Sequence, residues 1–443
     1  MDKTIAAAPI PPTLQQTFWY WLKLGFISFG GPAGQIAIMH TDLVENKHWV
    51  SEKRFLHALN YCMVLPGPEA QQLATYIGWL MHKTRGGLLA GGLFVLPSLL
   101  ILMILSYIYM RFGSTPAVAG VLYGIKPAVV AIVLFAAYRI GSRTLKSKAL
   151  WVIAFASFLA ITLLQLPFPL IVISAALIGY LGNHYAPKIF SGSGAHKGVD
   201  KHFGKAVIDD DSPTPAHAHF SWGGLVKFLI IGIVAWLLGM ASLTAIYGWS
   251  AVYTQMAWFF TKAALLTFGG AYAVLPYVYQ GAVTHYSWLT PAQMMDGLAL
   301  GESTPGPLIM VVAFVGFVGG WSQATLASPL VAGVLAACIV TFFTFLPSFI
   351  FIFMGAPFIE SSKNNLKLNA PLTAITTAVV GVIAALALFF ALHVFWPNHL
   401  NIDWLAMLAA VIGFVALYQF KVNTMRLIGV FAIFGLLYTW FYS

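Results

Sequence analysis

Two Pro-Gly-Pro triplets lie in the middle of long apolar segments of the sequence. Proline removes an amide donor and clashes with the preceding helical turn, and glycine adopts dihedral angles that other residues avoid. Each triplet therefore predicts a broken helix, whose resuming half would present free N–H groups and the positive end of its dipole to an anion. A harmless kink is the alternative for either triplet alone, but the matched pair favours a binding site. The triplets are Pro66, Gly67 and Pro68, and Pro305, Gly306 and Pro307.

A glycine pair and a lysine precede each triplet. Gly30-Gly31 and Gly269-Gly270 predict a second pair of breaks, and Lys23 and Lys262 each lie seven residues before their pair. A Lys within a span costs about 2.5–3.5 kcal/mol on insertion scales, unless its side chain snorkels to the interface. Because both copies keep the Lys, we predict two cationic groups that flank a pathway. Lys126, in a later span, is a third candidate.

Carboxyl and amide groups near the triplets differ between the two copies. Glu69 follows the first triplet and Glu302 precedes the second. Desolvation favours the neutral form of a carboxyl group, so both are candidates for carrying a coupled proton. Gln71, Gln72 and Thr75 could hydrogen-bond a ligand, whereas the second copy has apolar residues there. We therefore expect two unequal halves of one site; the apolar residues are Met310, Val311 and Phe314.

Composition identifies the class of protein. The 443 residues are 60% hydrophobic and only 8% charged, against roughly 25% charged residues in soluble domains. Such a chain is too apolar for a soluble enzyme or a nucleic-acid binder, and most of its apolar residues must face lipid. The net charge of +10 is what cytoplasmic loops of a membrane protein would supply.

The predicted fold is an all-α bundle of about thirteen transmembrane spans with broken helices. We divide the chain into a flexible tail (1–17), a first repeat (18–183), a polar linker (184–222), a connecting span (223–250) and a second repeat (251–443). The two segments 149–165 and 167–183, divided by Pro167-Phe168-Pro169, form either two short spans or a hairpin. The predicted spans are 18–39, 55–81, 87–111, 117–140, 149–165, 167–183, 223–246, 253–280, 293–319, 329–354, 371–396, 403–420 and 424–441.

The basic residues predict how these spans are oriented. With a cytoplasmic N-terminus, inside loops hold fifteen Lys and Arg against four outside, and the C-terminus lies in the periplasm. Three of the four misplaced charges belong to residues 40–54. Either that loop is an exception to the rule or the first segment does not fully cross the membrane.

A repeat with a single offset of 239 residues relates the two halves. It superimposes the tryptophans, lysines, glycine pairs and Pro-Gly-Pro triplets without a gap, and Leu96-Pro97-Ser98 matches Leu346-Pro347-Ser348 after a short insertion. Seven predicted spans separate the two starts, so the second copy enters from the opposite side. Inverted repeats with broken helices are typical of secondary transporters, with the substrate near the midplane.

These motifs resemble the chromate ion transporter family of prokaryotes, in its long two-domain form. The resemblance rests on residues 24–32, 49–55 and 65–73 in the first half and on 301–307 and 314–316 in the second. It implies an inner-membrane protein that exports chromate, driven by the proton-motive force, and that confers chromate resistance. It also implies roles for Pro32, for the glycine pairs and triplets, and for Glu69 and Gln72.

Other functions remain as alternatives. The residues alone predict a site for a tetrahedral dianion and do not separate chromate from sulfate; an anion channel is a second possibility. A chromate-reducing enzyme is disfavoured, because Cys62 and Cys338 form no cluster and no nucleotide-binding glycine motif occurs. We predict no catalytic residue, no cofactor and no metal site, with the linker histidines solvated. The expected partners are oxyanion, protons, lipid and a possible second copy in a homodimer.

Overall fold

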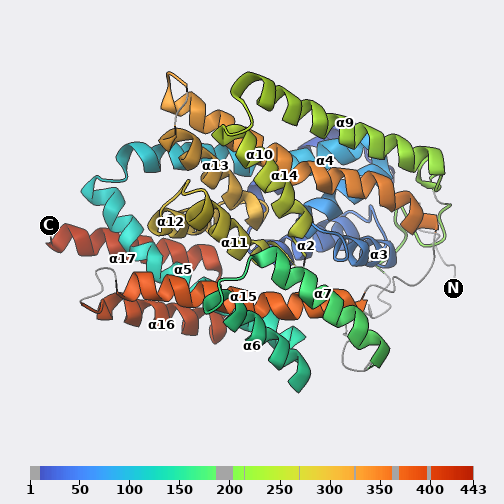
Figure 1. Ribbon diagram of the computed structural model, residues 1–443. Coiled ribbons are helices and arrows are strands. Elements are labelled where there is room, and N and C mark those ends of the chain that lie inside the picture. Colours follow the sequence, from blue (N-terminus) through green and yellow to red (C-terminus); the bar gives the residue numbers. More distant parts are fainter. Residues whose placement is uncertain are drawn as a thin grey trace.

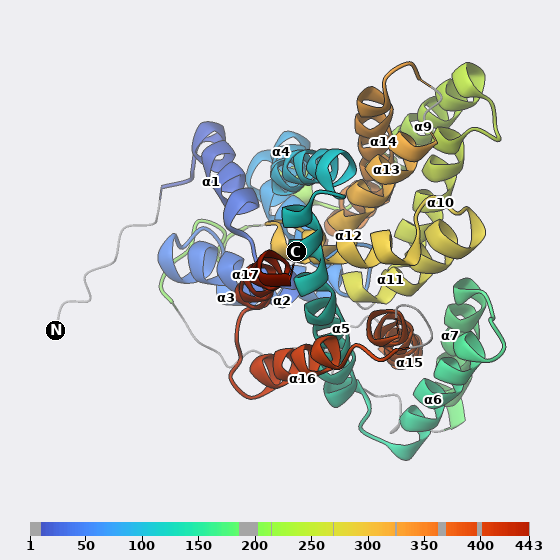
Figure 2. The same cartoon turned by 90° about the vertical axis from the view of Figure 1, so that its left-hand side faces the viewer.

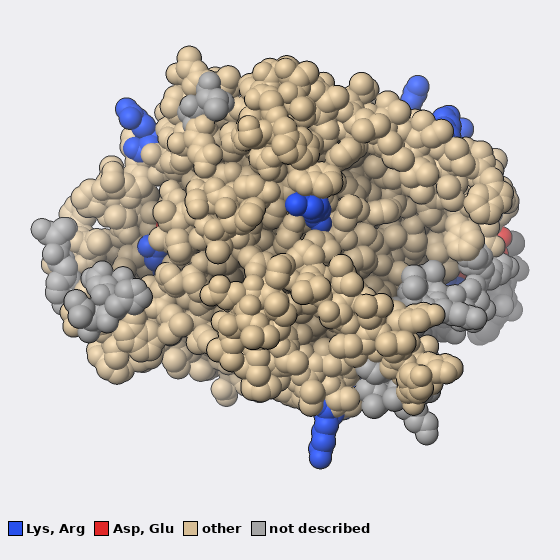
Figure 3. Space-filling model, in the orientation of Figure 1, with Lys and Arg blue, Asp and Glu red and all other residues tan. Residues whose placement is uncertain are grey.

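A computed structural model of the chain describes residues 10–185, 203–213, 215–268, 270–323, 326–361, 369–396 and 401–442. Helices make up almost all of these residues, and an isolated bridge between Val50 and Ile208 is the one β-type pairing among them (Figure 1). Seven described helices are long and apolar enough to cross a membrane. Figure 3 shows a face with only scattered charges. The predicted all-α membrane bundle is confirmed.

The first predicted span, 18–39, is a helical hairpin and does not continue in one direction. Helix α1 (Leu14–Ile27) begins with a Thr13 capping box, and α2 (Gly31–His40) follows the glycine pair. The Pro12 end of α1 contacts His82, whereas Gly25 lies against Pro97, deep in the molecule. After α2 the chain returns to the His82 end, where Trp49 pairs with Ile208.

The second predicted span, 55–81, is also a hairpin. Helix α3 (Glu52–Cys62) runs inward along α14 (Pro329–Ser361), with Arg54 paired to Glu360 and the Tyr61 hydroxyl donating to Phe351 O. After the first triplet, α4 (Glu69–Phe112) returns outward until its Tyr76 hydroxyl reaches Glu360. It then reverses direction at the non-helical dihedrals of His82 and Lys83. The rest of α4 runs back into the molecule, past the turns at the glycine pair and the triplet, which we call the tips of the two hairpins.

The second repeat forms the same two hairpins. Helices α10 (Val252–Leu266) and α11 (Ala271–Tyr279) flank the second glycine pair, and α12 (Pro291–Ser303) and α13 (Val311–Ser322) flank the second triplet. Their open ends meet where Met256 and Trp288 contact Gly319, at the Pro329 end of α14. The hairpins of the two repeats therefore open toward opposite ends of the molecule.

Two local features recur at the offset of 239 residues. Six-residue π-helical segments follow the first hairpin arm in both halves, at Thr41–Asn46 and Gln280–His285. Hydroxyl side chains of Ser51 and Thr290 then cap the starts of α3 and α12. The repeat seen in the sequence thus extends to backbone geometry.

A second group of helices packs beside the hairpins, in the lower part of Figures 1 and 2. Helix α5 contacts α15, α16 and α17, and α15 also contacts α6 and α7. Helix α9 (Trp222–Tyr247) covers α10 and α14 from the outside. The bounds of the other helices are α5 Pro116–Thr144, α6 Lys148–Thr162, α7 Phe168–Tyr185, α15 Asn369–Phe395, α16 Trp404–Tyr418 and α17 Thr424–Tyr442.

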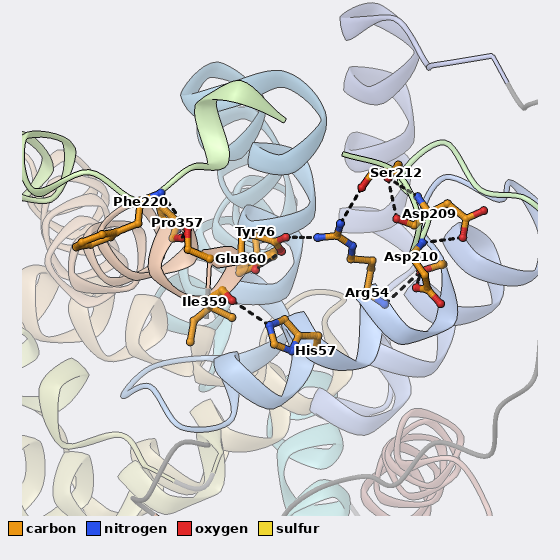
Figure 4. A network of polar contacts seen from close by, with 12 residues as sticks. Arg54, His57, Tyr76, Asp209, Asp210, Ser212, Phe220, Pro357, Ile359 and Glu360 are labelled. Atoms are coloured by element: carbon orange, nitrogen blue, oxygen red, sulfur yellow. Dashed lines mark hydrogen bonds and ion pairs between the residues drawn. The ribbon is translucent and has the colours of Figure 1, made fainter. Parts of the chain in front are cut away.

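The described part of the predicted linker, 203–213 and 215–221, packs on the open end of the first repeat. Ser51 Oγ donates to Asp210 at 2.6 Å, and Arg54 donates to Ser212 O beside its pair with buried Glu360 (Figure 4). Burial lowers the pKa of His217, whose ring contacts Trp79 O at 2.9 Å. This stretch is therefore docked on the repeat, and His217 is not solvated as predicted, whereas His184 and His219 are exposed; His196 and His202 lie outside the described residues.

The prediction of about thirteen spans is corrected by this geometry. Four predicted spans, 18–39, 55–81, 253–280 and 293–319, are hairpins whose two ends lie at one end of the molecule. An apolar run of that length can form either one spanning helix or two antiparallel half-helices. Hydropathy alone does not show whether the chain reverses direction within the run. Residues 40–54, with their three basic residues, therefore lie at the same end as the linker.

Cysteine labelling tests the direction of the first hairpin. In a background lacking Cys338, a membrane-impermeant maleimide should modify Asn46→Cys and Arg85→Cys from one side, and Ser114→Cys from the other. All three positions are exposed. Labelling of Asn46→Cys together with Ser114→Cys would show that the first segment crosses the membrane.

Candidate functional site

The tips of the hairpins from opposite repeats are hydrogen-bonded to one another. Gly67 N donates to Thr267 O at 2.8 Å, and Gly306 N donates to Ser28 O at 2.8 Å. These bonds are equivalents, because each residue of one pair lies 239 positions from its counterpart in the other. The triplet of each repeat thus meets the glycine-pair break of the other repeat.

Glycine is required at both triplet centres. Gly67 has φ +127° and Gly306 has φ +104°, where an L side chain is strained. A Cβ at Gly67 would lie 2.4 Å from Ser348 Oγ, and one at Gly306 would lie 2.7 Å from Ser98 Cβ. The tips are therefore packed closely against α4 and α14. Gly30, Gly31 and Gly270 also have positive φ in their breaks, whereas Gly269 lies outside the described residues.

Two glutamines follow the first triplet, and one of them bonds to it. Gln72 Nε2 donates to Pro66 O at 2.8 Å, and Gln71 Nε2 donates to Thr75 Oγ1 at 3.0 Å. Both side chains are fully buried, and their Oε1 atoms have no hydrogen-bond partner among the described residues. The backbone N–H groups of Glu69, Ala70 and Gln71 precede the first intrahelical bond of α4, from Gln72 N to Pro68 O.

Gln35 also belongs to this site, and the sequence analysis did not identify it. From α2, its Nε2 donates to Gly306 O and, at 3.4 Å, to Ser28 O, so it ties the two tips together. Its Oε1 is buried and unpartnered in the described structure. A lone amide in an apolar stretch after the glycine pair, with Val274 as its counterpart, was the available signal.

The two candidate proton carriers have different surroundings. The Tyr272 hydroxyl donates to Glu302 Oε1 at 2.6 Å, and Arg139 interacts with Glu302 electrostatically. Glu69 is the first residue of α4 and has no ion-pair partner among the described residues. Sequence reasoning missed both Tyr272 and Arg139, because neither lies near Glu302 in the chain.

The candidate lysines lie away from the hairpin tips. Lys23 is exposed on the outer face of α1, and Lys262 is half-buried with its Nζ 5.3 Å from the Trp258 ring centroid. Lys126 Nζ lies 3.9 Å from Asp296, which also accepts from Tyr109 at 3.0 Å. In this conformation the structure does not bring any of these lysines into contact with a triplet.

A pocket of about 530 Å³ lies elsewhere, between the start of α1, the turn at His82 and the docked linker. Its basic lining consists of Lys83, Arg85 and two histidines, His82 and His217. At the crossing tips, the N–H groups of Gly67 and Gly306 are engaged by carbonyls in the described conformation.

Comparison with known proteins identifies the family. The family model for chromate transporters matches residues 15–180 and 254–436, one match in each repeat. The chain belongs to the chromate transporter family. A chromate transport protein of Cupriavidus metallidurans is 30% identical over 380 residues, covering 86% of this chain and 83% of the relative. One from Pseudomonas aeruginosa is 32% identical over 387 residues, covering 87% and 82%.

A shorter relative matches a single repeat. An uncharacterised transporter of Bacillus subtilis is 30% identical over 168 residues, which cover 94% of that protein but 37% of this chain. One repeat can therefore exist as a separate chain in this family. No solved structure matches the protein.

Alanine at the tip glycines should destabilise the protein. We expect Gly67→Ala and Gly306→Ala each to lower the free energy of unfolding by at least about 1–3 kcal/mol, because of the positive φ and the contacts with Ser348 and Ser98. Gly92→Ala is the matched control, since its Cβ would meet nothing within 4 Å. Thermal unfolding in detergent measures the difference. Equal melting temperatures for all three variants would contradict the described tip packing.

Proposed function

We propose that this protein is a secondary active transporter that exports chromate across the bacterial inner membrane and thereby confers resistance. Family membership supports a role in chromate transport. The reciprocal hydrogen bonds of Gly67 and Gly306 are the observation on which the mechanism rests. An incoming oxyanion would replace the Thr267 and Ser28 carbonyls as acceptor for those two N–H groups. The first turn of α4 adds further N–H donors and its positive dipole end.

The charge of a dianion requires compensation outside the backbone. We assign this compensation first to Arg139, because it already interacts electrostatically with Glu302, beside the second triplet. Lys23 and Lys262 occupy the helices that lead into the glycine-pair breaks. In our proposal they raise the positive potential along the flanks of the pathway without contacting the bound anion. A lysine at this depth is retained only where it has such a role or an aqueous route.

Glu69 and Glu302 are the proposed proton carriers. Glu302 is held by Tyr272, whereas Glu69 has no ion-pair partner among the described residues. A carboxyl without fixed partners exchanges its proton with the least structural rearrangement. We therefore assign the coupled proton first to Glu69, which lies directly beside the N–H groups that would bind the anion. Protonation and anion binding would then influence each other through a shared local field.

Orientation follows from the corrected hairpins. With residues 40–54 moved to the linker side, the loop assignment made from the sequence gives eighteen Lys and Arg to that side and only Arg111 to the other. The positive-inside rule then favours a cytoplasmic N-terminus and a periplasmic C-terminus. In this proposal the hairpins of the first repeat open to the cytoplasm and those of the second to the periplasm.

Chromate uptake into inverted membrane vesicles tests the function. Energised vesicles containing the protein should accumulate chromate above vesicles without it, and an uncoupler should abolish that accumulation. Sulfate added as competitor measures the preference between the two dianions. Full-rate passage down the chromate gradient after uncoupling would instead identify a channel, and stronger accumulation of sulfate would identify a sulfate transporter.

The same assay examines the proton carrier. Glu69→Gln keeps the size and polarity of the side chain but cannot bind a proton, so this variant should equilibrate chromate without responding to the proton gradient. Glu45→Gln, at a π-helical segment distant from the tips, is the control and should accumulate chromate like the native protein. Uncoupler-sensitive accumulation by Glu69→Gln would assign the proton elsewhere, with Glu302 as the next candidate.

A further inference from the structure

Two buried serines occupy equivalent positions behind the crossing tips. Ser98 follows Pro97 in α4, and Ser348 follows Pro347 in α14. Their exposed fractions are 0% and 1%, and neither hydroxyl has a hydrogen-bond partner among the described residues. Leaving a buried hydroxyl unpaired costs about 1–3 kcal/mol. Two such groups at matched positions therefore call for a ligand that pairs with them.

Local pairing is available to a buried hydroxyl in these helices but is not used at Ser98 and Ser348, nor at Ser106 and Thr341. Buried hydroxyls in apolar helices commonly donate to the carbonyl four residues earlier. Thr344, one turn before Ser348 in α14, does so to Val340 O at 2.7 Å, and Thr75 in α4 does so to Gln71 O at 2.9 Å. Ser98 and Ser348 do not, so their hydroxyl groups remain available.

Each serine faces the triplet of the opposite repeat. Ser348 comes from the second repeat but lies against Gly67, where its Oγ would be 2.4 Å from an added Cβ. Ser98 comes from the first repeat but lies against Gly306, where its Oγ would be 3.2 Å from an added Cβ. Gln72 Nε2 shares the space beside Gly67, at 2.6 Å from the same added Cβ. One hydroxyl thus accompanies each crossing N–H group.

We propose that Ser98 and Ser348 bind the substrate, each donating its hydroxyl proton to an oxygen of the tetrahedral dianion held between the two triplets. This inference rests on the proposed oxyanion transport and adds the side chains that recognise the anion. Hydrogen bonds from a neutral hydroxyl to an ionised oxygen are short and about twice as strong as neutral ones. An oxyanion contacting both serines would also connect the two repeats, because each repeat contributes one donor to the other's triplet.

Alanine variants of the full-length protein in proteoliposomes test this assignment. Ser98→Ala and Ser348→Ala should each raise the chromate concentration for half-maximal transport by about tenfold or more, as expected for loss of a hydrogen bond to a charged group. Ser106→Ala is the matched control: it removes another fully buried, unpartnered hydroxyl from α4, two turns further along. The control should stay within twofold of the native protein.

Thermal unfolding separates binding from folding. Removing an unpartnered hydroxyl should leave the melting temperature of the ligand-free protein equal or higher, while the stabilisation produced by added chromate should fall in the double variant Ser98→Ala/Ser348→Ala. A double variant with native half-maximal concentration and native chromate stabilisation would overturn the role of the serines. Native protein that transports sulfate but not chromate would overturn the proposed chromate function, and the serines would then be judged by the same comparison with sulfate. Native protein that transports neither anion would overturn both proposals.

Discussion

Backbone N–H groups released at a helix break, far from water, require an acceptor, and this requirement organises the whole structure. Within an apolar bundle an unpaired backbone group costs several kcal/mol, so broken helices persist only where protein or a ligand satisfies them. Here the acceptors come from the opposite repeat: Thr267 O for Gly67 and Ser28 O for Gly306. The half-helices, the long α4 and α14 and the surrounding bundle hold these two bonds in place.

Reciprocal pairing gives the site its symmetry, and the side chains around it remove that symmetry. The backbone donors and the two serines occur in matched pairs. In contrast, Gln72 bonds to the first triplet, whereas Gln35 bonds to the second, where Tyr272 also holds Glu302. Symmetric donors suit a tetrahedral ligand that contacts both repeats. In our proposal, the unequal surroundings of the two carboxyl groups assign the coupled proton to Glu69 before Glu302. The shorter family relative, matching one repeat, shows that such halves also occur as separate chains.

Sequence reasoning predicted the breaks, because glycine and proline at matched spacing report backbone geometry directly. It could not predict the direction of the hairpins, since two antiparallel half-helices and one spanning helix have the same apolar length. The basic residues of residues 40–54 carried the missing information, since they raised the alternative that the first segment does not fully cross the membrane. Gln35, Tyr272 and Arg139 were missed because their roles depend on contacts between distant segments, and Lys23 and Lys262 are symmetric in sequence yet lie away from the tips.

Anomalous diffraction at the chromium absorption edge, from crystals of the protein grown with chromate, tests the central claim most directly. The account predicts one strong chromium peak between the two triplets, within hydrogen-bonding distance of the Gly67 and Gly306 N–H groups, with the Thr267 and Ser28 carbonyls displaced. A peak confined to the basic pocket beside His82 and Lys83, with both tip hydrogen bonds intact, would contradict it.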